Sequence, residues 1–300
     1  MFREIAIEPE VMAHWEWFLK LYDKFGYHEG MLIADFPTSW RREVIERANE
    51  LVREGVNQEI KVRSMVSRLQ LDSFKAGLYS SGRQPGEHAS WLDKAKNQNP
   101  PFDAIVACVT GECLPPVVLA KDFFWEDPLL MAKRQNRIAR NATCLVGAAE
   151  KLLRQAKEIR FVDRFFNPKK PEKRNPFVRL VDYLHECNPE ARRLQIYTQL
   201  VLEEATPDDY NRFLEHELPT GFSLEVFFLE KLEQGENLHP RFLMADIGGL
   251  QYDHGLDEGD GTCVVNVLEK DFKERLWEEY SPDSKVFGFH RRFPSIVLGG

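Results

Sequence analysis

Short β-prone runs and amphipathic helical segments alternate along the chain between residues 159 and 230. This alternation is typical of an α/β layer with a largely parallel sheet. The predicted strands cover 159–166, 192–199 and 222–230, and the predicted helices between them cover 176–187 and 206–218. Two closing strands are expected at 241–246 and 262–269. Short Gly-rich turns join these last strands, which predicts a mixed sheet flanked by helices.

The residues before this alternation have a mostly helical pattern. Apolar residues recur at helical spacing in 11–25, 35–55 and 58–82, whereas 102–109 is a compact β-prone run. We therefore expect a mainly α-helical N-terminal region over residues 1–122 and an α/β domain over 123–300. Within the second part, residues 127–158 predict one long amphipathic helix, with Asp127 as its N-cap.

Composition limits the class of protein. With 43% hydrophobic residues, the 300-residue chain can bury a real core. Its net charge of −8 argues against a protein that wraps nucleic acid with an overall basic surface, but leaves room for a local basic groove. Five cysteines without C-x-x-C spacing predict reduced thiols rather than a zinc site. No apolar run approaches the roughly 20 residues that span a bilayer, and no signal peptide is recognisable. We expect a cytoplasmic protein without a metal or cofactor.

The most chemically loaded stretch is 237–261, which contains His239, Arg241 and Asp246. In a strand, residues two apart point to the same face, so His239 and Arg241 can address one phosphate. Histidine supplies a nucleophile or a proton near neutral pH, and arginine supplies a permanent fork for phosphate oxygens. Asp246, at the end of the strand, is expected to orient the histidine.

The spacing H-x-R-x-x-x-x-D resembles the signature of the phospholipase D-like superfamily, with Arg241 in the place of the lysine. Helix–strand order over about residues 148–270 is similar to one unit of that fold. The nearest variant is the phospholipase D-like domain at the C-terminus of MIT-domain proteins. Matching pieces are His239-Pro240-Arg241, Gly248-Gly249 and Gly255-Leu256-Asp257. That variant binds phosphoinositide membranes and is regarded as non-catalytic.

The resemblance implies a metal-independent reaction through a phosphohistidine. His239 would be the nucleophile or the acid, Arg241 would hold the phosphate and Asp246 would orient the histidine. Glu258 is a further candidate acid in the following loop. The chain departs from the family pattern in having arginine for lysine, which are not equivalent. It also has a single motif, so turnover would require a homodimer that brings two His239 side chains together.

Basic residues supply candidate phosphate ligands. The segment 167–176 follows the first strand of the α/β unit, where a ligand-facing loop is expected, and a solvated surface loop is the alternative. Asp163 lies at the same strand end and is a candidate neighbour of the site. Lys133, Arg137 and Arg140 are expected to share one face of the helix over 127–158. The candidate phosphate-binding residues are Arg241, Arg164, Lys169, Lys170, Lys173 and Arg174.

Three functions remain open. The first is a phospholipase D-like phosphodiesterase, a nuclease of a bacterial defence-type system. The second is a non-catalytic module that reads phosphates of nucleic acid or anionic lipid. The third is an interaction subunit that binds a protein partner through the N-terminal region.

Overall fold

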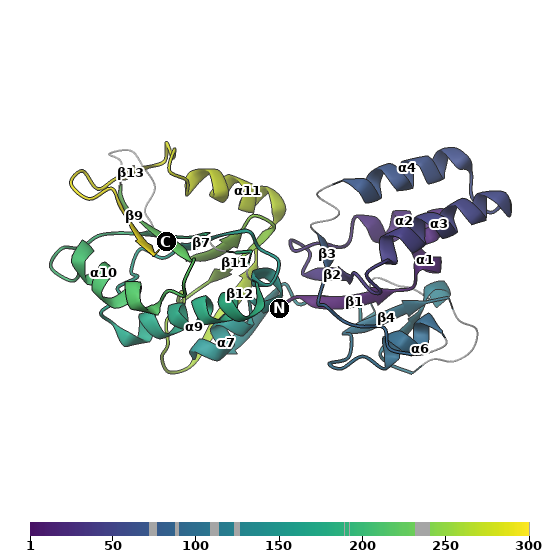
Figure 1. Ribbon diagram of the computed structural model, residues 1–300, viewed down its shortest axis with the longest axis horizontal. Coiled ribbons are helices and arrows are strands. Elements are labelled where there is room, and N and C mark those ends of the chain that lie inside the picture. Colours follow the sequence, from purple (N-terminus) through teal and green to yellow (C-terminus); the bar gives the residue numbers. More distant parts are fainter. Residues whose placement is uncertain are drawn as a thin grey trace. The chain divides into compact units, whose positions relative to one another are not determined.

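The chain divides into two compact units, Phe2–Lys133 and Arg134–Gly300, in the computed structural model (Figure 1). The structure describes residues 1–71, 77–87, 90–108, 114–122, 127–188, 190–191, 193–231 and 241–299. Both units are built from helices and strands, so the α/β class expected from the sequence is confirmed. The division falls at residue 133, later than the sequence-based boundary at 122.

The first unit is built around a parallel sheet of five strands in the order β3-β2-β1-β4-β5. Its strands are β1 (Arg3–Ile7), β2 (Met31–Ala34), β3 (Leu78–Tyr79), β4 (Ala104–Ala107) and β5 (Val117–Leu119). Its helices are α1 (Pro9–Ala13), α2 (Trp15–Tyr22), α3 (Trp40–Arg53), α4 (Glu59–Gln70), α6 (Trp91–Lys96) and the 3-10 turn η1 (Ala120–Asp122).

The expectation of a mainly helical N-terminal region missed this sheet. Ile5 and Ile7 pack into the core with Trp40 of α3, whereas Ala6 packs on the other face with Phe102. A strand that is buried on both faces is a continuous apolar run, without the polar alternation that marks a half-exposed strand. At four or five residues, β1 and β2 are also too short to show a period.

The second unit is built around a mixed sheet in the order β13-β9-β8-β7-β10-β11-β12-β6, and β14 also pairs with β9. β7, β8 and β9 are parallel to one another, and β10 runs antiparallel to β7. Its strands are β6 (Gln135–Ala139), β7 (Glu158–Val162), β8 (Arg193–Thr198), β9 (Ser223–Lys231), β10 (Phe242–Ala245), β11 (Gly248–Tyr252), β12 (Thr262–Val267), β13 (Phe287–Phe289) and β14 (Ser295–Gly299).

Helices flank both faces of this sheet, as the sequence predicted. Figure 1 shows α9 and α10 on one side and α11 on the other, where Leu276 and Tyr280 pack against Phe242 and Met244 of β10. The helices of the unit are α7 (Ala142–Gly147), α8 (Glu150–Leu153), α9 (Pro171–Cys187), α10 (Pro207–Leu214), the 3-10 turn η2 (Glu215–Glu217) and α11 (Lys270–Glu279).

The long helix predicted over 127–158 is wrong. Residues Gln135–Ala139 form β6, an antiparallel edge strand on β12, and two short helices follow it. The residues of β6 are largely exposed, so no buried face imposes a strand pattern on their sequence. Asn141 then begins a new helix, because its side chain accepts a hydrogen bond from the Cys144 backbone. Arg137 and Arg140 therefore do not share a helix face.

Candidate functional site

The site lies at the carboxyl ends of parallel strands β7 and β8. Asp163 follows β7 directly, and Gln199 follows β8 after Thr198. β10 begins at this same edge, because it is antiparallel to β7 and its Phe242 pairs with Val162. This register sets Arg241, the residue before Phe242, opposite Asp163. Ligands of α/β sheets commonly bind at this edge.

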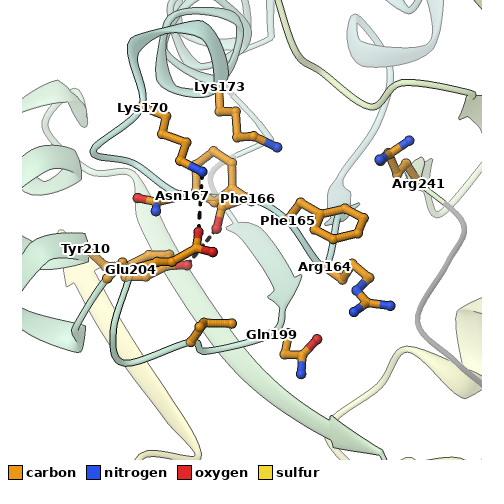
Figure 2. Close-up of a pocket in the computed structure, with 12 residues that line it drawn as sticks. Arg164, Phe165, Phe166, Asn167, Lys170, Lys173, Gln199, Glu204, Tyr210 and Arg241 are labelled. Carbon is orange, nitrogen blue, oxygen red and sulfur yellow. Dashed lines mark hydrogen bonds and ion pairs between the residues drawn. The ribbon is translucent and has the colours of Figure 1, made fainter.

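A cavity of about 420 Å³ opens here (Figure 2). Among the residues that the structure describes, four cationic side chains and one carboxylate, that of Glu204, line it. Apolar and aromatic side chains, among them Phe165 and Tyr210, form the rest of its wall. The cations are Arg164, Lys170, Lys173 and Arg241.

Side-chain turns hold the loop between β7 and α9 in place. Asp163 Oδ1 accepts a hydrogen bond from the Phe165 backbone N–H at 2.9 Å, and Asn167 Oδ1 accepts one from Lys169 at 3.0 Å. Such Asx turns fix the backbone locally. From α10, Tyr210 donates its hydroxyl to the Phe166 carbonyl at 2.8 Å. The loop therefore presents Arg164, Phe165 and Lys170 to the cavity from a fixed backbone.

Asp163 is buried beside the cavity residue Arg241, with 1% of its surface exposed. Burial raises the pKa of its carboxyl, and the charges of Lys173 and Arg241 oppose that rise. Arg241 Nε lies 3.6 Å from Asp163 Oδ1, and the Arg241 guanidinium also donates to the Asp253 carbonyl. Among the residues described, the buried Nε atoms of Arg164 and Arg241 have no hydrogen-bond partner.

The loop after β11 covers the Asp163–Arg241 pair. Gly255 has φ of +78°, and a Cβ there would lie 2.5 Å from Asp163 Oδ2, so only glycine allows this close approach. Asp257 then accepts from Arg140 at 2.7 Å and lies 3.6 Å from Lys173 Nζ. Asp257 thus ties the loop to both the end of β6 and the first turn of α9.

Four of the six predicted phosphate-binding residues converge on the cavity, namely Arg164, Lys170, Lys173 and Arg241. The other two have different neighbours. Lys169 lies 3.7 Å from the Asp209 carboxylate, and Arg174 packs against the Phe213 ring while donating to the Pro168 carbonyl. His239, the predicted nucleophile, lies outside the described residues.

The role predicted for Asp246 is wrong. It occupies the turn after β10, whereas Arg241 precedes that strand, so roughly 16 Å of extended chain separates them at about 3.3 Å per residue. Its carboxylate accepts hydrogen bonds from the Lys157 and Glu158 backbones, at the start of β7. Asp246 therefore belongs to the opposite edge of the sheet and is a structural residue of that turn.

Glu258 is also engaged in structure. Its Oε1 accepts from the Ala142 backbone at 2.9 Å, at the first residue of α7, and its Oε2 accepts from Asn175 Nδ2 at 3.1 Å. Both carboxylate oxygens are thus used to hold the loop against α7 and α9. This corrects the prediction that Glu258 is a free acid of the site.

Sequence reasoning missed Phe165 and Tyr210 as parts of the cavity wall. The sequence placed Tyr210 on the predicted helix over 206–218. That placement does not show which strand end the helix packs against, so it could not assign Tyr210 to the cavity. Phe165 was read as part of a strand over 159–166, whereas β7 ends at Val162. Among the described residues, no group of three or more His, Cys, Asp or Glu side chains is arranged to hold a metal ion.

Comparisons with known proteins do not identify a family for this chain. No family model and no curated protein matches the chain. Among solved structures, the chain is similar to TrmBL2, described as an archaeal chromatin protein with a novel mode of DNA binding. The sequence identity is 16%, the match covers 49% of this chain and 51% of TrmBL2, and the TM-score is 0.25. A likeness at this level says nothing further about function. No helix among the described residues is long and apolar enough to cross a membrane.

Proposed function

We propose that the second unit recognises phosphate groups of nucleic acid in the cavity at the ends of β7 and β8. The observation that carries this proposal is the convergence of Arg164, Lys170, Lys173 and Arg241 on one concave surface. Cationic side chains around a cavity attract phosphate oxygens.

The cations are not fully neutralised by the protein. Lys170 pairs with Glu204 at 3.3 Å at an exposed position, where such a pair contributes little. Arg164 forms no ion pair with a described carboxylate, and its ring neighbour is Phe165. The planar guanidinium of an arginine that lines a cavity and forms no ion pair there is suited to donate to phosphate oxygens.

A charge-matched pair of variants tests this function. Arg164→Gln with Lys170→Gln removes two cavity cations, and Lys169→Gln with Arg174→Gln removes two cations of the same loop that do not line the cavity. Binding of a fluorescent oligonucleotide is measured by anisotropy at several salt concentrations. We expect the cavity pair to weaken binding at least tenfold and to reduce the salt slope by about 0.7 for each lost contact. Equal losses for both pairs would contradict the proposal.

A second candidate function is hydrolysis of the bound phosphodiester. The observation that favours it is that Arg241, the cation of the phospholipase D-like motif, lines the cavity, and His239 precedes it by two residues in sequence. The resemblance implies attack by the histidine on phosphorus, and a second histidine from another copy of the chain would protonate the leaving oxygen.

Cleavage of labelled single- and double-stranded nucleic acid in EDTA tests hydrolysis. Activity is expected to disappear in His239→Ala and to persist in His254→Ala, which removes an exposed histidine of the following loop. Sedimentation of the active protein should show a dimer. Cleavage that survives in His239→Ala rules out the histidine mechanism and leaves recognition without turnover.

A further inference from the structure

Phe165 is an exposed aromatic ring in the wall of the cationic cavity. Its side chain is 44% exposed, whereas the next residue, Phe166, is buried against Phe161 and Phe177. The Asx turn of Asp163 reverses the chain at this point, so Phe165 faces outward while Phe166 enters the core. The fold therefore gains little from burying Phe165.

Three cavity cations surround this ring, as Figure 2 shows for Arg164 and Arg241. The guanidinium carbons of Arg164 and Arg241 lie 4.6 and 5.2 Å from the ring centroid, and Lys173 Nζ lies at 5.8 Å. Val201, which is 39% exposed, adds a second apolar surface to the same cavity. Phosphate-binding and apolar surfaces are therefore adjacent within one site.

We propose that Phe165 stacks on a base of single-stranded nucleic acid whose backbone phosphate lies among Arg164, Lys173 and Arg241. This inference rests on the proposed function and names its substrate class. Proteins that hold single strands combine a cationic groove along the backbone with aromatic side chains on which bases stack. One aromatic ring beside one cluster of cations matches a single nucleotide, which carries one base and one phosphate.

The same features disfavour a duplex and a bilayer. In a duplex the bases are stacked on one another, so Phe165 would have no base face to contact unless a nucleotide were flipped out. Insertion of Phe165 among acyl chains would carry three neighbouring cations toward the hydrocarbon, which is unfavourable. The volume of about 420 Å³ lies within the range of small-molecule pockets, roughly 300–1,000 Å³, and suits one splayed nucleotide.

The test separates the base from the phosphate. The full chain and its Phe165→Leu and Phe165→Trp variants are titrated against labelled oligothymidylate, an abasic strand of equal length, a duplex, and vesicles of phosphatidylcholine and phosphatidylserine. We expect Phe165→Leu to weaken oligothymidylate binding roughly tenfold and to leave abasic-strand binding unchanged. Phe165→Trp should bind oligothymidylate as tightly as the wild type or more tightly. Unchanged amide hydrogen exchange in residues 158–187 shows that the variants remain folded.

The outcomes distinguish this inference from the proposed function. If the wild-type chain binds neither the two single strands nor the duplex, the proposed function fails and the inference fails with it. If both strands bind and Phe165→Leu weakens them equally or not at all, the base-stacking role is overturned while phosphate recognition stands. Duplex binding as tight as single-strand binding, or vesicle binding that alone depends on Phe165, also overturns the inference.

Discussion

Arg241 Nε lies 3.6 Å from the buried Asp163 Oδ1, across the antiparallel pairing of β10 with β7. The cation and the anion come from parts of the sequence that are almost 80 residues apart, and the pairing of Phe242 with Val162 brings them together. Asp163 thereby holds Arg241 at the cavity wall.

Replacing Arg241 with alanine should destabilise the second unit more at pH 7 than at pH 4. Burial raises the pKa of Asp163, so the stability contributed by this group is greatest below its unfolded pKa of about 3.9 and falls as pH rises toward the folded pKa. Loss of Arg241 raises that pKa further. We expect a cost of about 1–3 kcal/mol at pH 7, which shrinks at pH 4. Denaturation followed by hydrogen exchange in this unit measures it, with Arg241→Lys as the charge-retaining control. An equal cost at both pH values would show that Asp163 is not involved.

Gly255→Ala should damage the site itself. Its new Cβ would meet Asp163 Oδ2 at 2.5 Å and Arg241 Cδ at 2.8 Å, at a φ that disfavours L-residues. Gly261→Ala is a matched control, because its φ is +84° but no atom lies within 4 Å of the added Cβ. We expect both variants to lose about 1–2 kcal/mol of stability from the backbone conformation, and only Gly255→Ala to lose oligonucleotide binding. If the two variants bound the oligonucleotide with the same affinity, the contact of residue 255 with Asp163 and Arg241 would have no role in binding.

Glu258→Gln should act on stability and not on chemistry. The amide keeps one acceptor oxygen for Ala142 or Asn175 and loses the other, which costs about 1 kcal/mol, and Glu258→Ala loses both. Hydrogen exchange at the start of α7 should rise in that order. If the protein cleaves phosphodiesters, the pH profile of Glu258→Gln should match that of the wild type. If Glu258→Gln instead removed one side of a bell-shaped pH profile, Glu258 would act as an acid in the reaction.

Lys273 should make the second unit more stable as pH rises from about 8 to 10.5. Burial lowers its pKa to about 8, with Asp246 opposing the shift, whereas its unfolded value is near 10.5. In this window the unfolded state binds more protons than the folded state, so unfolding becomes less favourable as pH rises. Below pH 8 the full penalty of the buried charge is present. The free energy of unfolding of the wild type should therefore rise relative to that of Lys273→Met across the window, and a constant difference between the two proteins would contradict this prediction.

Local sequence signals explain which elements the sequence predicted. The helix α10 begins where Thr206 and Pro207 indicated, because the Thr206 and Asp209 side chains form a capping box that is a purely local interaction. β8 and β9 are likewise found where short β-branched and aromatic runs predicted them. β6 was misread as helix because an exposed edge strand takes its conformation from its partner β12.

The sequence predicted that basic residues would line the candidate site, but it identified only some of the residues that do. Arg164, Lys170 and Lys173 were singled out by their position after a predicted parallel strand, and the structure places all three on one cavity, because strand ends converge at one edge. The motif predicted that Asp246 orients His239, yet β10 places Asp246 at the end of the strand opposite Arg241. No local pattern distinguishes Lys170 from Lys169, since the direction of each depends on the Asx turn of Asn167.

Local sequence patterns were enough to predict the α/β class, the alternation of helices and strands after residue 159, and the cluster of basic residues after the first of those strands. These follow from local propensity and hydrophobic period, which neighbouring residues set together. The packed fold was needed to show that Asp163 and Arg241 face each other, that Asp246 and Glu258 hold turns, and that Phe165 is exposed. Those outcomes depend on the register between distant strands and on which side chains the packed core excludes.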